Sequence, residues 1–281
     1  MNGENSMIQE LIHTAVNVQQ RVIYSEYLER DVIIDVYLPA KTYENNAFNL
    51  LLINDGQDLR TMDFRTLLNS MIAPATTVPF ISVGIHCGID RMNEYGTICR
   101  ADYKGRGSKA GLYSKFIFDE LLPYIKSELN ITSFKEKSFA GFSLGGLSAL
   151  DIVWNHADEF ARVGVFSGAL WWRRHGYEDE CYNWEKDRIM HLQVYKGVLH
   201  PWLNFFFECG RFDETADRNN NGIIDAIEDT TDLITALKSI GYKNDQIFYL
   251  ELKDGRHDVE TWKRAFPAFL RWGWGIVSRE A

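Results

Sequence analysis

Short apolar runs separated by longer amphipathic stretches recur along this chain, and they predict alternating strands and helices. Residues 50–53, 80–85 and 162–166 are almost entirely apolar, as expected for strands that are buried on both faces of a parallel sheet. Two further strands are predicted at 203–208 and 246–252. This alternation predicts an α/β fold in which helices cover both faces of a mostly parallel sheet.

The first fifty residues have a different pattern. A short helix is predicted at 5–14, followed by two extended segments at 18–27 and 32–38. The second segment alternates with a period of two residues, which is typical of a strand. We interpret the pair as an antiparallel entry to the sheet, and a polar turn at 45–49 leads to the first buried strand.

Helices are predicted at 60–72, at 108–129 and near the C-terminus. The middle helix carries apolar residues at every fourth position, and Pro123 is expected to kink it. The loop at 86–106 is unusually long, and loops of this length are often functional. No internal repeat, low-complexity tract or linker divides the sequence, so we predict a single domain over residues 1–281.

The most informative motif is a glycine-rich turn at 137–147, between a predicted strand and a predicted helix. Gly141, Ser143 and Gly145 form the pattern G-x-S-x-G, which is typical of a nucleophile elbow. A serine hydroxyl must stand clear of the backbone to attack a carbonyl group, and a sharp strand-to-helix turn achieves this. Neighbouring chain then comes so close that glycine is favoured on both sides of the serine. The alternative is an ordinary glycine-rich turn with a surface serine.

Two backbone N–H groups are candidates for an oxyanion hole. The first belongs to Leu144, at the start of the helix that follows the serine. The second belongs to Gln57, because the loop after the corresponding strand supplies the other donor in folds with this elbow. The alternative interpretation of residues 54–58 is a plain turn in which Asp58 caps the next helix.

A serine nucleophile needs a general base and an orienting acid, which follow an elbow in the order Ser, Asp or Glu, His. Ser143, Asp213 and His257 satisfy this order, and the last two each follow a predicted strand. Because parallel strands end at one edge of the sheet, we expect the three side chains to converge there. His257 would take the serine proton and Asp213 would orient the imidazole. Glu214 and Asp258 remain alternatives for the acid.

Large aromatic residues gather in an insertion at 168–200. This insertion is either a small cap that lines an acyl or aromatic pocket, or a surface excursion packed by its own rings. The candidate substrate contacts, from the insertion and from the long loop, are Arg91, Tyr95, Trp171 and Trp172. His86 is expected to be a structural histidine, because His257 is better placed to act as the base.

Residues 217–228 match the twelve-residue calcium loop of an EF-hand, with glycine at its sixth position. Its predicted ligands are Asp217, Asn219, Asn221, the Ile223 carbonyl, Asp225 and Glu228. A strand rather than a helix precedes the loop, so we predict a structural Ca²⁺ site and not a calcium sensor. The alternative is a solvated asparagine-rich turn.

Charge and composition narrow the partners and the compartment. The net charge of −9 and the lack of any basic block argue against nucleic acid and anionic membranes as partners. No run of about 18 apolar residues predicts a membrane-spanning helix. No apolar signal segment follows the polar residues 1–6, and the four cysteines form no metal or disulfide pattern. A cytoplasmic location is therefore expected, although a weak calcium site would suit extracellular calcium levels better.

Several motifs together point to a known family. They lie at 54–57, 91–95, 105–107, 141–146, 166–168 and 255–257. On these motifs the sequence, from about residue 32 to residue 275, resembles the enterochelin esterase and esterase D group of the α/β-hydrolases. The resemblance implies a serine hydrolase of small-molecule esters that needs no organic cofactor, with Ser143 as nucleophile and His257 as base. Many relatives lack the 217–228 loop, so the calcium prediction rests on this sequence alone.

The leading hypothesis is hydrolysis of carboxylic esters through an acyl-Ser143 intermediate. Members of the resembled family cleave siderophore trilactones, feruloyl or acetyl esters of carbohydrates, and simple acyl esters, and the motifs do not distinguish among these. Acyl transfer to an alcohol on the same triad is a second hypothesis, and it requires a pocket that excludes water. A calcium-stabilised binding module without catalysis is a third, against which the Ser143 and His257 pair argues. The sequence makes no prediction of the oligomeric state.

Overall fold

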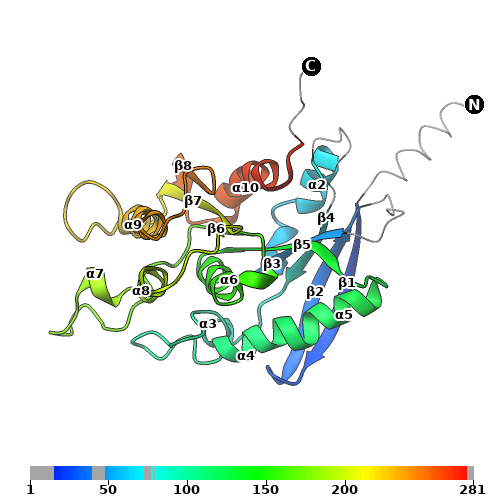
Figure 1. Ribbon diagram of the computed structural model, residues 1–281, viewed down its shortest axis with the longest axis horizontal. Helices are drawn as coiled ribbons and strands as arrows, with labels where there is room; N and C mark the ends of the chain where they lie inside the picture. Colours follow the sequence, from blue (N-terminus) through cyan, green and yellow to red (C-terminus); the bar gives the residue numbers. More distant parts are fainter. Residues whose placement is uncertain (1–15, 40–47, 73–76, 79, 277–281) are drawn as a thin grey trace, which may run out of the picture.

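A single mixed sheet forms the centre of the computed structural model, which describes residues 16–39, 48–72, 77–78 and 80–276. Its strands are β1 (Asn17–Ser25), β2 (Arg30–Leu38), β3 (Phe48–Asn54), β4 (Phe80–Ile85), β5 (Phe134–Phe142), β6 (Arg162–Phe166), β7 (Asn204–Phe212) and β8 (Ile247–Arg256). Their order is β1-β2-β4-β3-β5-β6-β7-β8 (Figure 1). β2 runs antiparallel to β1 and β4, and every other neighbouring pair is parallel. The predicted α/β fold with a mostly parallel sheet is confirmed.

Helices cover both faces of this sheet (Figure 1). They are η1 (Gly56–Leu59), α2 (Phe64–Ile72), α3 (Arg91–Glu94), α4 (Ala110–Lys115), η2 (Phe116–Leu121), α5 (Leu122–Glu128), α6 (Leu144–Asn155), η3 (Ala157–Glu159), α7 (Trp184–Asp187), α8 (Ile189–Lys196), α9 (Asp225–Ser239) and α10 (Val259–Trp274). Successive residues of β3 pack in two different apolar layers, one on each face of the sheet. Leu50 and Leu52 pack in a cluster with η2, α5, α6, α8 and α9. Leu51 and Ile53 pack in a second cluster with α2 and α10.

The continuous helix predicted at 108–129 is interrupted in the structure. α4 passes into the π-helical segment η2, and α5 then begins with Pro123 in its first turn. Proline has no N–H to donate to the preceding turn, and a wider π-helical turn directly before it accommodates the loss. The irregularity therefore precedes the proline, where a simple kink at Pro123 was expected.

The helix predicted at 60–72 begins later, at Phe64 in α2. The chain first forms η1 and a turn in which Asp63 has a φ of 50°. A right-handed helix cannot contain a residue in this left-handed conformation, so the helix starts after it. The helix predicted at 5–14 and most of the turn predicted at 45–49 lie outside the described residues.

Half of the aromatic insertion at 168–200 belongs to the main helical layer. Ile189, Met190 and Val194 of α8 are buried in the same cluster as α6 and α9, together with Trp172. This half is core structure and does not form a separate cap. The other half, around Trp171 and Tyr177, lines a cavity near the end of β7.

No helix of the described residues is long and apolar enough to cross a membrane. All four cysteines have free thiols, as the sequence predicts. Neither finding constrains the chemistry at the edge where the parallel strands end. That edge carries the predicted nucleophile, acid and base.

Candidate active site

Ser143 occupies a strained turn between β5 and α6. Its backbone has φ 53° and ψ −123°, which side-chain-bearing residues rarely adopt. A Cβ on Gly141 would lie 2.3 Å from the Gly145 carbonyl oxygen, and one on Gly145 would lie 2.5 Å from the Asp55 carboxylate. Only glycine fits at these two positions, so the G-x-S-x-G spacing has a steric cause. The turn lifts Ser143 to the edge of the sheet, where its side chain is half-buried.

The Leu144 and Gln57 N–H groups both lie in the first turn of a helix. Gly146 and Leu147 donate to the Ser143 carbonyl oxygen at 3.1 and 3.2 Å, so the α6 ladder starts after Leu144. Leu144 N–H therefore has no acceptor within the helix. Gln57 is the second residue of η1, and its side-chain oxygen accepts from Cys87 N–H at 3.2 Å. Both N–H groups lie just after strand ends, Leu144 after β5 and Gln57 after β3.

A polar brace ties the Gln57 loop to the rest of the site. Arg91 binds Asp55 with two hydrogen bonds, at 2.6 and 2.7 Å. Asp55 N–H donates to the Tyr95 hydroxyl at 3.2 Å, and Asn54 donates to the Gly145 carbonyl oxygen at 2.8 Å. Asp55 itself has a φ of 58°. These contacts hold the β3 loop against the elbow.

Two of the predicted substrate contacts, Tyr95 and Trp172, are buried in the structure. Tyr95 is completely buried, so its ring faces the protein core and not a ligand. Trp172 is also completely buried, and its ring closes against Gly96 and Gly107. Both side chains position loops. The sequence could not reveal this, because exposure depends on which distant segments cover a ring.

Arg91 and Trp171 remain accessible at the site. The Arg91 side chain is 27% exposed, and its charge lowers the pKa of His257, which places it near the imidazole. Trp171 is partly exposed, and the Arg106 guanidinium lies 4.9 Å from the centre of its ring. The long loop at 86–106 therefore brings Arg91 close to His257.

Asp213 and His257 follow neighbouring strand ends. Phe212, the last residue of β7, pairs with Arg256, the last residue of β8. Asp213 and His257 directly follow these two residues. Asp213 is close enough to His257 for each to affect the other's pKa. No hydrogen bond joins the side chains of Ser143, His257 and Asp213 in the described structure. Catalytic hydrogen bonds are often long before substrate binds.

Electrostatics distinguish Asp213 from Glu214. Burial raises the pKa of Asp213, and the positive charge of His257 opposes this shift. Burial also raises the pKa of Glu214, whose charged neighbours are Asp225, Asp229 and Arg218 and do not include His257. Asp213 therefore faces the imidazole, whereas Glu214 faces the α9 side. Burial lowers the pKa of His257 and Asp213 opposes this shift, which favours a neutral imidazole able to accept a proton near pH 7.

A buried carboxyl group close to Asp213 was not predicted from the sequence. Glu208 in β7 is 1% exposed, and neither of its oxygens has a hydrogen-bond partner among the described residues. Burial, and then the charge of Asp213, raise the pKa of Glu208 to about 8. Ser167, which has a φ of 45°, donates its N–H to the Glu208 backbone carbonyl at 2.8 Å, and Trp262 donates to the Ser167 hydroxyl at 2.9 Å. A glutamate inside a predicted buried strand was the signal that could have identified this group.

Glu208 gives a prediction for the pH dependence of stability. Its folded pKa of about 8 exceeds the unfolded value of 4.5, so the folded protein binds the extra proton between these pH values. Stability from this group is full below pH 4.5 and is lost as the pH rises through 8. At about 1.4 kcal/mol per pKa unit, the loss amounts to several kcal/mol. Glu208→Gln should therefore lose less thermal stability between pH 5 and pH 8 than the unmodified protein does.

Glu178→Gln is the matched control for this measurement, because Glu178 is exposed. Its melting temperature should fall between the two pH values as steeply as that of the unmodified protein. If Glu208→Gln also keeps the full slope, Glu208 is ionised in the folded state at both pH values and its assignment is wrong.

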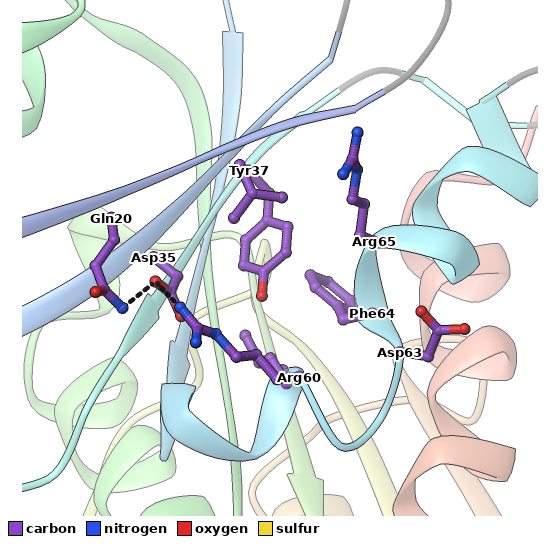
Figure 2. A pocket seen from close by; sticks show the side chains of 9 residues that line it. Gln20, Asp35, Tyr37, Arg60, Asp63, Phe64 and Arg65 are labelled. Carbon is purple, nitrogen blue, oxygen red and sulfur yellow. Dashed lines mark hydrogen bonds and ion pairs between the residues drawn. The ribbon is translucent and has the colours of Figure 1, made fainter.

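A second cavity, of about 360 Å³, lies between β1, β2 and α2 (Figure 2). Its buried charge, Asp35, accepts from Gln20 at 2.9 Å and lies 3.9 Å from Arg60. His86 pairs with the same carboxylate at 2.9 Å, so its predicted structural role is confirmed. None of the predicted catalytic residues lines this cavity.

The loop at 217–228 has features that fit a calcium ion. Asp217 accepts from Gly222 N–H at 2.9 Å and Asn221 N–H at 3.2 Å, and Gly222 has a φ of 85°. The Asn219 and Asn221 amides both converge on one oxygen of Glu228, at 2.8 and 2.5 Å. The other oxygen of Glu228 is buried without a hydrogen-bond partner. Half a turn of either amide would present its oxygen to the same centre.

Asp225 departs from the predicted ligand set. It is 5% exposed and pairs with Arg218 at 2.9 Å, and Arg218 also binds Asp229 of α9 at 2.6 Å. Arg218 therefore anchors the loop to α9 through Asp225 and Asp229. No group of three or more His, Cys, Asp or Glu side chains in the described residues is arranged to hold a metal ion. A calcium site here would depend on asparagine and backbone oxygens as well as on Asp217 and Glu228.

Comparison with known proteins gives consistent matches. A family model described as "Putative esterase" matches residues 25–272. The chain is similar to a ferulic acid esterase, with a TM-score of 0.68 and 18% identity over 92% of this chain and 97% of that one. It is also similar to BES protein from Bacillus cereus, with a TM-score of 0.66 and 17% identity over 92% and 97%.

A third similar structure is the enterobactin esterase from Shigella flexneri, solved in the presence of enterobactin. Its TM-score is 0.68 and its identity 20%, over 90% of this chain. The match covers 57% of the Shigella chain, so this chain spans little more than half of it. At these identities the solved structures establish the α/β-hydrolase fold.

Proposed function

Because this protein belongs to the esterase family, we propose that it hydrolyses carboxylic esters through an acyl-enzyme on Ser143. In this proposal His257 is the general base and Asp213 is the acid that orients it. The family membership supports ester hydrolysis, and the geometry of the sheet edge supports the assignment of roles.

The proposed reaction has two halves. Ser143 Oγ attacks the ester carbonyl carbon while His257 takes its proton, and the oxyanion that forms accepts from Leu144 and Gln57 N–H. The imidazolium then protonates the leaving alcohol as the C–O bond breaks. In the second half His257 deprotonates a water molecule, which attacks the acyl carbon. The proton returns to Ser143 as the acid leaves.

The observation that carries this proposal is the backbone of Ser143. A φ of 53° in a side-chain-bearing residue costs about 1–3 kcal/mol and persists only where the surrounding structure enforces it. Here Gly141 and Gly145 leave no space for relaxation, and α6 begins at the next residue. The arrangement exposes a hydroxyl beside free N–H groups, which is what acyl transfer requires.

Asp213 is preferred to Glu214 as the orienting acid because its charge interacts with His257. Asp258 is a weaker alternative, because its side chain accepts from Thr261 N–H at 2.8 Å and caps α10. A capping carboxylate already has a structural role at the start of its helix.

The proposal is tested by turnover of a panel of esters. p-Nitrophenyl acyl esters, a feruloyl ester and a catecholate trilactone are supplied to the purified protein, with and without a sugar alcohol. We expect release of the free acid at a rate that the alcohol leaves unchanged. Formation of a new ester with the alcohol would show that the reaction is acyl transfer and not hydrolysis. A folded protein that turns over no ester would contradict the proposed reaction.

A structural Ca²⁺ at 217–228 forms the second part of the proposal. Asp217, Asn219, Asn221, Glu228 and the Ile223 carbonyl would hold it, and the ion would supply a fixed positive centre that orders the loop. The loop begins four residues after Asp213. Ordering it would limit the movement of the acid, and the convergence of the Asn219 and Asn221 amides on Glu228 supports this assignment.

Removing calcium should lower the melting temperature. An ion at 100 times its Kd stabilises the folded state by about 2.7 kcal/mol, which corresponds to several degrees in a protein of this size. EDTA should remove this stabilisation, and added Ca²⁺ should restore it. Asp217→Ala should abolish the response, whereas Asp245→Ala, an exposed site outside the loop, should retain it. An unmodified protein whose melting temperature ignores both EDTA and Ca²⁺ would refute the site.

A further inference from the structure

A cavity of about 310 Å³ adjoins the proposed catalytic residues. Glu214, one of its lining residues, directly follows Asp213. Trp171, another, lies two residues after Ala169, whose N–H donates to the Ser143 carbonyl oxygen at 3.1 Å. One wall of the cavity therefore begins next to Asp213, and another begins close to the turn that carries Ser143. A substrate bound at Ser143 can extend into this space.

The cavity contains a buried arginine that lacks a carboxylate partner. Arg173 is 6% exposed, and its Nε has no hydrogen-bond partner. Its Nη2 donates to the Tyr103 hydroxyl at 3.3 Å, and no carboxylate of the described residues pairs with it. The neighbouring Arg174, by contrast, binds Asp187 at 2.9 Å. Burying a cation without an anion is costly, and such charges are normally paired.

Aromatic rings surround this guanidinium. Its central carbon lies 3.8 Å from the centre of the Tyr177 ring and 4.7 Å from that of Tyr103. The ring faces stabilise the cation but supply no acceptor to Nε, and the Tyr103 hydroxyl is the acceptor of Nη2. Together with Trp171, these rings give the cavity flat apolar walls around the Arg173 guanidinium.

The remaining charges of the cavity do not satisfy Arg173. Arg106 and Asp225 are each paired with a residue that does not line the cavity. Lys104 adds a second cation, and Glu214 is the one lining carboxylate without an ion pair in the described structure. Among the described residues, the cavity thus holds two cations without a carboxylate partner, Arg173 and Lys104, against the single unpaired carboxylate of Glu214. The local balance favours an anion, although the whole chain carries a net charge of −9.

We infer that this cavity binds a carboxylate group carried by the part of the ester that does not react, with Arg173 as its counter-ion. The inference rests on the proposed ester hydrolysis at the adjacent Ser143. A guanidinium matches a carboxylate with two parallel hydrogen bonds, and the flat walls accommodate a ring or short chain that carries the carboxylate. The preferred substrates are therefore esters with an anionic acyl or alcohol group.

The test compares each carboxylate ester with its carboxamide counterpart. One pair carries the group on the acyl side, in p-nitrophenyl esters of glutaric acid and of its monoamide. The other carries it on the alcohol side, in 3-carboxyphenyl and 3-carbamoylphenyl acetate. The unmodified protein should prefer the carboxylate in at least one pair. Arg173→Met should reduce that preference, measured as a ratio of kcat/KM values, roughly tenfold or more.

Two matched variants separate recognition from folding. Arg173→Lys keeps the charge and should keep part of the preference, and Arg174→Met should keep all of it. An Arg173→Met variant that loses activity equally on both members of each pair would show a purely structural arginine. An unmodified protein without a preference in either pair would also overturn the inference.

A binding measurement keeps this inference separate from the proposed function. Benzoate and benzamide are titrated by calorimetry into Ser143→Ala and into Ser143→Ala/Arg173→Met. Benzoate should bind the first protein in preference to benzamide, and the second protein should lose this preference. This result would support the cavity even if no ester were hydrolysed. Equal binding of both compounds to Ser143→Ala would refute the cavity even if ester hydrolysis were established.

Discussion

Ser143→Ala should lower kcat for ester hydrolysis by about 10³-fold or more. The variant lacks the hydroxyl that forms the acyl-enzyme, and no other residue at the strand edge can replace it from the same turn. Backbone donors and the binding cavity remain, so a small residual rate above that in water is expected. Initial rates on the best ester of the panel, at saturating substrate, provide the measurement.

Ser148→Ala is the matched control, because Ser148 lies in α6 one turn after the elbow and is 1% exposed. This variant should retain kcat within about twofold while its melting temperature changes little. A Ser143→Ala protein that is folded and keeps near-normal turnover would end the proposed mechanism. The φ of 53° at position 143 would then need another explanation.

His257→Ala should also lower kcat by about 10³-fold or more, because the serine and the leaving alcohol both lose their proton carrier. His257 is exposed at the surface although neighbouring side chains partly desolvate its ring, whose centre lies 5.5 Å from that of Trp262 in an edge-on arrangement, so its removal should have little effect on stability. Asp213→Asn should cost less than His257→Ala, since the base remains but loses its orienting charge. Rates are measured beside melting temperatures to exclude unfolding.

His200→Ala controls for the loss of a histidine elsewhere, because His200 packs against Trp154 and Trp202 before β7. It should retain full kcat. Unchanged turnover in His257→Ala would assign the base to another residue. A larger loss in Glu214→Gln than in Asp213→Asn would transfer the acid role to Glu214.

The sequence predicted the elements whose causes are local. The spacing of Gly141, Ser143 and Gly145 reflects contacts within a few residues, and these contacts are present in the structure. The strands that precede Asp213 and His257 are apolar runs, so their ends could be placed within a few residues. The sequence predicted that both ends lie at one edge of the sheet, and the structure adds that the two strands are neighbours.

The features that the sequence did not reveal depend on distant segments. Tyr95 looked like a substrate contact because its loop is long, yet Asp55 and the core cover it. Glu208 stands at the end of a predicted buried strand, but the charges and rings that surround it come from other segments. In the fold, Tyr103 and Tyr177 pack around the Arg173 guanidinium, and no carboxylate of the described residues reaches it. Only the folded chain defines such neighbourhoods.

The loop at 217–228 illustrates the same division. Its twelve-residue pattern placed a glycine at position 222, where the structure has a φ of 85°. It did not predict that Arg218, at the second loop position, takes Asp225 for an ion pair. That pair depends on the packing of α9, which the loop sequence does not specify.

Covalent labelling tests the central claim most directly. The protein is treated with a fluorophosphonate, digested, and analysed by peptide mass spectrometry, with Ser143→Ala and His257→Ala in parallel. The account predicts one adduct, on Ser143, formed quickly in the unmodified protein and slowly or not at all in His257→Ala. Folded protein that stays unlabelled at Ser143, or that is labelled instead at another serine, would contradict it.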